Sequence, residues 1–224
     1  MKKTVVIVAA GSGTRMGGKI PKQYLQLQGK PIVIHTLEKF RNFDPEIKLI
    51  VVLAAAHQEF WTRIKASYEM AGDVIIARGG ATRYASVKNG LAHVDQDELV
   101  GIHDAVRPLV SLDTLKRSYD AAFREGSGIP VLEMEDSVRI LNGDGSSGHL
   151  DRSRLRRVQT PQVFKSERIK KAYEQAYDPD FTDDASVYEA AFGPVTLVEG
   201  NRENIKITTS LDLRLAELLI APPD

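Results

Sequence analysis

The feature that most constrains this chain is residues 5–24, where an apolar run leads into a glycine-rich loop with several cations. Residues 5–10 are all apolar, as expected for a buried strand. The loop that follows contains glycines and cations at Gly11, Gly13, Gly17, Gly18, Arg15, Lys19 and Lys22. Glycines let backbone N–H groups approach phosphate oxygens closely, and cations neutralise the phosphate charge. The segment therefore predicts a polyphosphate site at the end of a buried strand.

Composition excludes several classes of protein. The 224 residues are 42% hydrophobic, enough for one large domain with a sizeable core. Lys plus Arg and Asp plus Glu both total 30, and a net charge near zero argues against a nucleic-acid-binding protein. The absence of cysteine excludes a disulfide framework and thiol chemistry. The N-terminal apolar run is too short for a signal-peptide core, and no 18-residue apolar stretch exists, so we expect a soluble cytoplasmic protein without membrane contact.

Apolar, β-branched runs alternate with segments of helical spacing over the first 132 residues. We expect strands at residues 5–8, 49–53, 74–76, 99–102 and 129–132. Helical stripes lie between them, of which Phe60, Ile64 and Tyr68 are one example. Continuously apolar strands that alternate with helices indicate an α/β fold with a mostly parallel sheet covered by helices. Ligands of such sheets bind at the carboxyl ends of the strands, so the loops after the strands are the candidate site.

Residues 133–160 interrupt this alternation. A turn cluster at 142–148 is flanked by extended runs at 137–141 and 149–151, which is typical of a hairpin with a long tip. We expect one domain over residues 1–224 with a protruding β-arm at about 136–157, and we favour a dimerisation arm over a plain surface loop. After the arm, the pattern predicts further elements: helices at 166–177, 183–192 and 211–220, and a strand at 195–198.

The glycine loop fits neither of the two commonest phosphate-binding fingerprints. The dinucleotide motif G-x-G-x-x-G fails because Met16 occupies its last position and Pro21 cuts short the helix that must follow. The P-loop motif fails because Ile20 stands where a magnesium-binding hydroxyl is needed. What remains is a loop that wraps a nucleoside triphosphate, with Arg15 and Lys22 reaching its phosphates.

Two other strand ends carry residues with suitable chemistry. Gly79 and Gly80 precede Ser86, which could hydrogen-bond the edge of a base, although an ordinary strand–helix turn capped by Thr82 explains the same residues. Directly after the 99–102 strand, Asp104 suits a metal ion or a sugar hydroxyl, and Arg107 suits a phosphate.

Two later segments are less specific. Four arginines between residues 152 and 157 form either a solvated hairpin face or an anion site. Residues 204–208 have a strand-like pattern with one candidate cation, Lys206. Residues 181–186 are typical of a helix start, with Thr182 or Asp183 as the cap.

Seven of these stretches occur together in one order over nearly the whole chain. They are AAGSGTRM, PKQY, GGATRYASV, HDAVRP, RRVQTPQVF, FTDDAS and VEGNRENIKIT. In this order they resemble the 2-C-methyl-D-erythritol 4-phosphate cytidylyltransferase family of the non-mevalonate isoprenoid pathway. The resemblance implies a Rossmann-like nucleotidyltransferase fold, a homodimer joined by a β-arm, and a divalent metal, usually Mg²⁺. It also implies that CMP passes from CTP to methylerythritol 4-phosphate with release of pyrophosphate.

The resemblance also implies roles for individual residues. Arg15 and Lys22 match the catalytic cations. The positions that match CTP contacts are Ala9, Ala10, Gly11, Gly13, Arg15, Lys22, Gly79, Gly80, Ser86 and Asp104. The positions that match contacts to the sugar-alcohol phosphate are Asp104, Arg107, Ser137, Arg152, Thr160 and Lys206, with Arg152 reaching into the neighbouring subunit's site. Two residues depart from a common version of the pattern: Ser137 replaces a threonine, and Ala81 replaces an aspartate near the base.

The chemistry of such a transfer accounts for these residue types. Two anions must meet, and a phosphorus centre with five oxygens gathers charge that fixed cations stabilise. The nucleophile is already a phosphate oxygen, so an in-line displacement needs no general base. Two alternatives remain at this stage: a ribitol-5-phosphate cytidylyltransferase, and a non-catalytic nucleotide-binding module. An NAD-dependent oxidoreductase is excluded by Met16 and Pro21.

Overall fold

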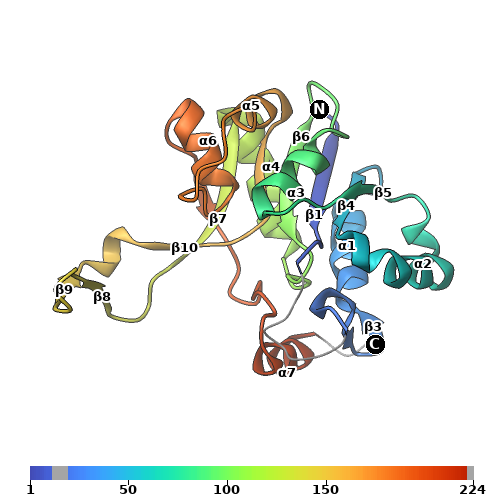
Figure 1. The fold of residues 1–224 in the computed structure, drawn as a ribbon, viewed down its shortest axis with the longest axis horizontal. Coiled ribbons are helices and arrows are strands. Elements are labelled where there is room, and N and C mark those ends of the chain that lie inside the picture. Colours follow the sequence, from blue (N-terminus) through green and yellow to red (C-terminus); the bar gives the residue numbers. More distant parts are fainter. Residues whose placement is uncertain (12–19, 221–224) are drawn as a thin grey trace.

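The computed structural model describes residues 1–11 and 20–220, and its centre is a mainly parallel sheet flanked by helices (Figure 1). The strands of this sheet are β1 (Lys3–Val8), β4 (Lys48–Leu53), β5 (Ile75–Arg78), β6 (Leu99–Asp104), β7 (Ser127–Glu133), β10 (Arg156–Val158), β11 (Gln162–Lys165) and β12 (Leu197–Glu199). Within the described residues their order is β10-β7-β11-β6-β1-β4-β5, and β12 also pairs with β7. β1 is parallel to β4 and β6, whereas β11 is antiparallel to both β6 and β7. The predicted α/β class is confirmed.

Both faces of the central sheet are covered, which explains the continuous apolar runs within β1 and β4. Helices α1 (Ile32–Phe43), α2 (Gln58–Ser67) and α4 (Leu112–Glu125) pack on one face, and α3 (Arg83–Leu91), α5 (Ser166–Ala172) and α6 (Asp184–Phe192) on the other. In β1, Val5 and Ile7 point into the first layer and Val6 into the second. Because alternate side chains enter different cores, every position of β1 from Val5 to Val8 is apolar.

The last helix, α7 (Ser210–Leu219), lies beside the short hairpin formed by β2 (Gln26–Leu27) and β3 (Lys30–Pro31). Ala216 is fully buried there in a small cluster that includes Leu27 and Ile207. A helix is present where one was expected at 211–220, but Leu211 and Leu218 do not bury it against the body. Leu211 is 73% exposed and Leu218 is 83% exposed.

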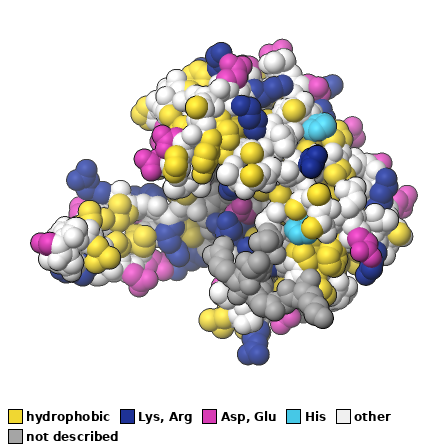
Figure 2. Space-filling model, in the orientation of Figure 1, with side chains coloured by type: hydrophobic (Ala, Val, Ile, Leu, Met, Phe, Trp, Pro, Cys, Tyr) yellow, Lys and Arg dark blue, Asp and Glu magenta, His cyan; other side chains and the backbone are white. Residues whose placement is uncertain are grey.

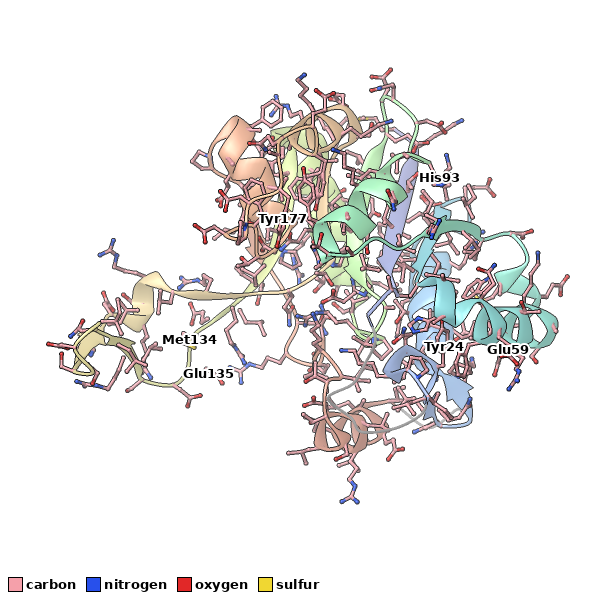
Figure 3. The ribbon with its side chains drawn as sticks, in the orientation of Figure 1. Tyr24, Glu59, His93, Met134, Glu135 and Tyr177 are labelled. Carbon is pink, nitrogen blue, oxygen red and sulfur yellow. The ribbon has the colours of Figure 1, made fainter. Side chains whose placement is uncertain are left out.

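An extended arm projects from the body of the molecule between β7 and β10 (Figure 1). Its hairpin consists of β8 (Val138–Leu141) and β9 (Ser147–Leu150), paired antiparallel. Met134 and Glu135, labelled in Figure 3, lie on the stalk that joins it to β7. Hydrophobic side chains are visible on the arm surface in Figure 2, and Leu141 is 80% exposed.

Three expectations about secondary structure were wrong or incomplete. The helix expected at 166–177 is shorter, because α5 ends at Ala172 and the chain then turns to bury Tyr173 against Tyr84. Residues 204–208 form no strand; this segment is held instead by a backbone bond from Ile207 N to Val106 O. β11 was not expected, because its four residues follow a proline at the edge of the irregular 133–160 region. No helix within residues 1–11 and 20–220 has the length and apolar character needed to cross a membrane.

Candidate active site

A cavity of about 440 Å³ opens at the carboxyl ends of the central strands, where the sequence predicts a site. Its lining comes from the ends of β1 and β6, from the turn at residues 22–24, from the start of α3 with the turn before it, and from the C-terminal segment. The lining residues are Val8, Ala9, Ala10, Gly11, Lys22, Gln23, Gly80, Ala81, Thr82, Arg83, Ser86, Asp104, Ala105, Val106 and Lys206. The fold therefore brings together several predicted site residues that are far apart in sequence. Gly13 and Arg15 lie outside the described residues.

The turn between β5 and α3 requires glycine because neighbouring backbone lies very close. A Cβ at Gly79 would lie 2.7 Å from Ala10 Cβ and 3.2 Å from Leu53 O, and one at Gly80 would lie 3.0 Å from the carbonyl carbon of Ala85. Ser86 Oγ accepts a hydrogen bond from Gly80 N at 3.0 Å, so this buried hydroxyl also shapes the turn. Thr82 caps α3 by accepting from Ala85 N at 3.0 Å, as the simpler interpretation of this segment predicts.

Asp104 is the electrostatic centre of the cavity. Its Oδ2 lies 2.9 Å from Lys206 Nζ and 3.4 Å from Arg107 Nε, and the Asp104 side chain is only 12% exposed. Burial alone would raise the pKa of Asp104, but the positive charges of Lys206, Arg83 and Arg107 outweigh burial and hold this pKa well below its usual range. The carboxylate is therefore ionised at neutral pH.

Arg83 lines the cavity, although sequence reasoning did not single it out. Its guanidinium makes two bonds to Asp184, from Nη1 to Oδ1 at 2.8 Å and from Nη2 to Oδ2 at 2.6 Å, and it lines the cavity. Burial would lower the pKa of Arg83, but Asp184 raises it further than burial lowers it. Tyr173 Oη donates to the same fully buried carboxylate at 2.7 Å. The only sequence signal at Asp184 is a helix start, and Asp183 does cap α6.

Thr160 lies directly behind Asp104. Its Oγ1 accepts from Asp104 N at 3.1 Å and lies 3.0 Å from His103 Nδ1. His103 Nε2 is 3.1 Å from Arg107 O, so a neutral ring can donate there and accept from Thr160. Thr160 is buried and does not line the cavity, so in this structure it fixes the end of β6.

The C-terminal segment is anchored to the same place. Arg107 Nη1 donates to Asn204 O at 2.7 Å, and Asn204 Nδ2 donates to Thr160 O at 2.9 Å. These bonds hold the chain two residues before Lys206, which explains how a segment without strand structure still positions a cation.

Two predicted residues lie away from the cavity of their own chain. Ser137 and Arg152 are both exposed on the arm, and Arg152 Nη1 donates to Glu135 O. Neither residue lines the cavity.

The buried His103 predicts a pH dependence of stability. Burial lowers the pKa of His103 from 6.5 to about 4. As the pH falls below about 6.5, the unfolded chain binds a proton that the folded chain does not, so the free energy of unfolding decreases until about pH 4. Between pH 7 and pH 4.5 we expect this group to contribute a loss of about 2 kcal/mol. Urea denaturation of wild type and His103→Gln at both values tests this, and an equal loss in the two proteins would contradict it.

Comparison with known proteins shows the family of this chain. The family model described as 2-C-methyl-D-erythritol 4-phosphate cytidylyltransferase matches residues 3–221. A protein of that name from Bacteroides thetaiotaomicron is 47% identical over 220 residues, covering 98% of this chain and all of the relative. The crystal structure of the enzyme of that name from Francisella tularensis has a TM-score of 0.81 and 32% identity, covering 98% of this chain and 100% of its own. The 4-diphosphocytidyl-2C-methyl-D-erythritol synthase of Anaerococcus prevotii has a TM-score of 0.82 and 27% identity, covering 97% of each chain. The chain belongs to the 2-C-methyl-D-erythritol 4-phosphate cytidylyltransferase family.

Proposed function

We propose that this protein transfers CMP from CTP to 2-C-methyl-D-erythritol 4-phosphate, giving 4-diphosphocytidyl-2-C-methyl-D-erythritol and pyrophosphate. Family membership supports this activity. The main structural support for this activity is a single cavity at the strand ends. It is lined by the glycine turns, by Lys22 and by the Asp104–Lys206 pair. A volume of about 440 Å³ suits ligands of this size. We further propose that residues 1–224 form one nucleotidyltransferase domain that acts in the cytoplasm.

The reaction is an in-line displacement at the α-phosphorus of CTP. A phosphate oxygen of the sugar phosphate forms a new P–O bond as the bond to pyrophosphate breaks, so no covalent enzyme intermediate or general base is needed. Lys22, together with Arg15 from the glycine loop, stabilises the charge that gathers on the phosphorus oxygens in the transition state.

The two substrates take opposite sides of the cavity. We assign the turn at Gly79, Gly80 and Ser86 to the nucleoside, with backbone groups beside Ala81 in place of a carboxylate. We assign Asp104, Arg107 and Lys206 to the sugar-alcohol phosphate. Asp104 accepts from a hydroxyl group of the sugar alcohol, and the two cations neutralise the phosphate.

A divalent metal, Mg²⁺ in the first instance, is part of this proposal. No group of three or more acidic or histidine side chains suited to a metal occurs within residues 1–11 and 20–220. The triphosphate would therefore supply most of the ligands, with Asp104 as the candidate protein ligand. Both ion pairs of Asp104 use Oδ2, which is consistent with a role for Oδ1 toward a cation or hydroxyl. The bound metal would neutralise triphosphate charge and help pyrophosphate to leave.

One assay separates this function from its alternatives. We expect pyrophosphate release from CTP with methylerythritol 4-phosphate, and a Lys22→Ala variant whose kcat is lower by about 10²–10³-fold, as for loss of one oxyanion donor. Lys116→Ala is the matched control, since this exposed lysine lies on α4 and pairs only with Asp120 among the ion pairs described. Near-normal turnover by Lys22→Ala would contradict its catalytic role. Preference for ribitol 5-phosphate would reassign the acceptor, and no release with either would favour a binding module.

We also propose a homodimer joined by the β-arm. The arm projects from the body (Figure 1). Its exposed Ile140 and Leu141 provide apolar surface for a second subunit. Ser137 and Arg152 are too exposed and too far along the arm to line their own cavity, which is consistent with a contact across the dimer.

Deletion of residues 138–156 tests the role of the arm. We expect a monomer by light scattering, with greatly reduced transfer activity because the partner's Arg152 is lost. A Leu218→Ser variant, which changes an exposed apolar residue on α7, should remain dimeric and active. A deletion variant that stays dimeric and fully active would refute the proposal.

A further inference from the structure

A buried amide side chain lies beneath the start of the glycine loop. Gln23 belongs to the short helical turn η2 (Lys22–Tyr24) and is 2% exposed. Its Nε2 donates to Ala9 O at 2.7 Å and to Gly11 O at 3.2 Å. Gln23 thus bonds the chain on both sides of Ala10, at the point where β1 gives way to the loop.

His57 completes this contact from a third element. It ends the turn η3 (Ala55–His57) after β4, and its Nδ1 lies 3.3 Å from Ala9 O and 3.2 Å from Gln23 Nε2. Burial lowers the pKa of His57, which favours the neutral ring at pH 7. A neutral His57 that donates from Nδ1 to Ala9 O leaves both amide hydrogens of Gln23 for the two carbonyls.

The residue after Gln23 keeps the turn from shifting. The Tyr24 ring stacks on Phe60 with centroids 5.1 Å apart and meets the His57 ring edge-on at 5.6 Å. In Figure 3 the labelled Tyr24 lies between the β2–β3 hairpin and α2. The aromatic contacts therefore fix the backbone from which Gln23 and Lys22 both extend.

We propose that Gln23 is a positioning residue, which orients the Ala9–Gly11 backbone and holds it in register with Lys22, so that both segments meet the triphosphate of CTP in the geometry of the transition state. A planar peptide points its N–H away from its carbonyl, so fixing Ala9 O also fixes the direction of Ala10 N–H. Ala9, Ala10, Gly11, Lys22 and Gln23 all line the cavity. The inference rests on the proposed function, and it assigns to a single amide the coupling between the two phosphate-binding segments.

We expect removal of the Gln23 amide to lower the rate of catalysis more than the stability of the fold. Without the amide, Ala9 O still has its hydrogen bond with His57 Nδ1. Gly11 O can accept a hydrogen bond from solvent instead, because Gly11 is exposed. The fold therefore loses little, whereas the loop loses its fixed relation to Lys22. A misplacement of about 1 Å in catalytic groups can cost about 10²-fold in rate.

The test compares Gln23→Met, which keeps the size but removes both donors, with the wild-type enzyme. We expect kcat for CTP and methylerythritol 4-phosphate to fall by about 10–100-fold, with the Kd for CTP rising by less than about threefold. The melting temperature should change by only a few degrees. Gln26→Met is the matched control, because Gln26 lies just after the same turn and its side chain is exposed. Gln23→Asn, one methylene shorter, is the second variant if Gln23→Met does not fold.

Three results would overturn the inference. The first is a kcat within about twofold of wild type for the folded variant. The second is a higher Kd for CTP with unchanged kcat, which would mean that Gln23 contributes only to the binding of CTP. The third is a loss of activity that matches a loss of folded protein in both variants. A wild-type enzyme that releases no pyrophosphate would instead refute the proposed function, and this inference with it.

Discussion

A buried carboxylate at the end of β6 is the constraint on which the site depends. Asp104 is almost wholly withdrawn from water, and an ionised group in that position is costly unless cations surround it. Those cations come from separate parts of the chain: Arg107 from the loop after β6, Arg83 from α3, and Lys206 from the C-terminal segment. The cluster can therefore form only when β5, β6 and the C-terminal segment are all in place. A cavity built in this way has its charges fixed before substrate arrives, which is the arrangement that favours catalysis at phosphate.

Buried polar side chains support this cavity from two sides. Behind Asp104, the Thr160 hydroxyl accepts from the backbone of β6, and Asn204 of the C-terminal segment donates to the backbone carbonyl of Thr160. Beneath the glycine loop, Gln23 and His57 bond the end of β1. Groups of this kind are expensive to bury without partners, so they specify one arrangement of the loops more strongly than apolar packing would. Residues that line the cavity from loops thereby obtain fixed positions.

Sequence reasoning predicted the layers of the fold and the edge of the sheet where the site lies. Strands with apolar residues at every position indicate burial on both faces, and the alternation with helices then places the loops. Asp104 and Lys206 were singled out by chemistry and resemblance, but their 2.9 Å contact required the structure. The pairing of Arg83 with Asp184 had no local signal, because one residue starts α3 and the other starts α6. Gln23 and the backbone role of Thr160 were hidden for a related reason: a side chain that acts on the backbone leaves no spacing pattern.

From their contact at 2.9 Å, we expect Asp104 and Lys206 to act as one unit in the transfer reaction. A double-mutant cycle on kcat/KM with Asp104→Asn, Lys206→Met and the double variant measures this directly. Because each residue neutralises the other, we predict that the double variant is less impaired than the sum of the single effects, by at least about 1 kcal/mol of coupling. Additive effects, within about 0.5 kcal/mol, would show that the two residues act independently and would contradict the claim.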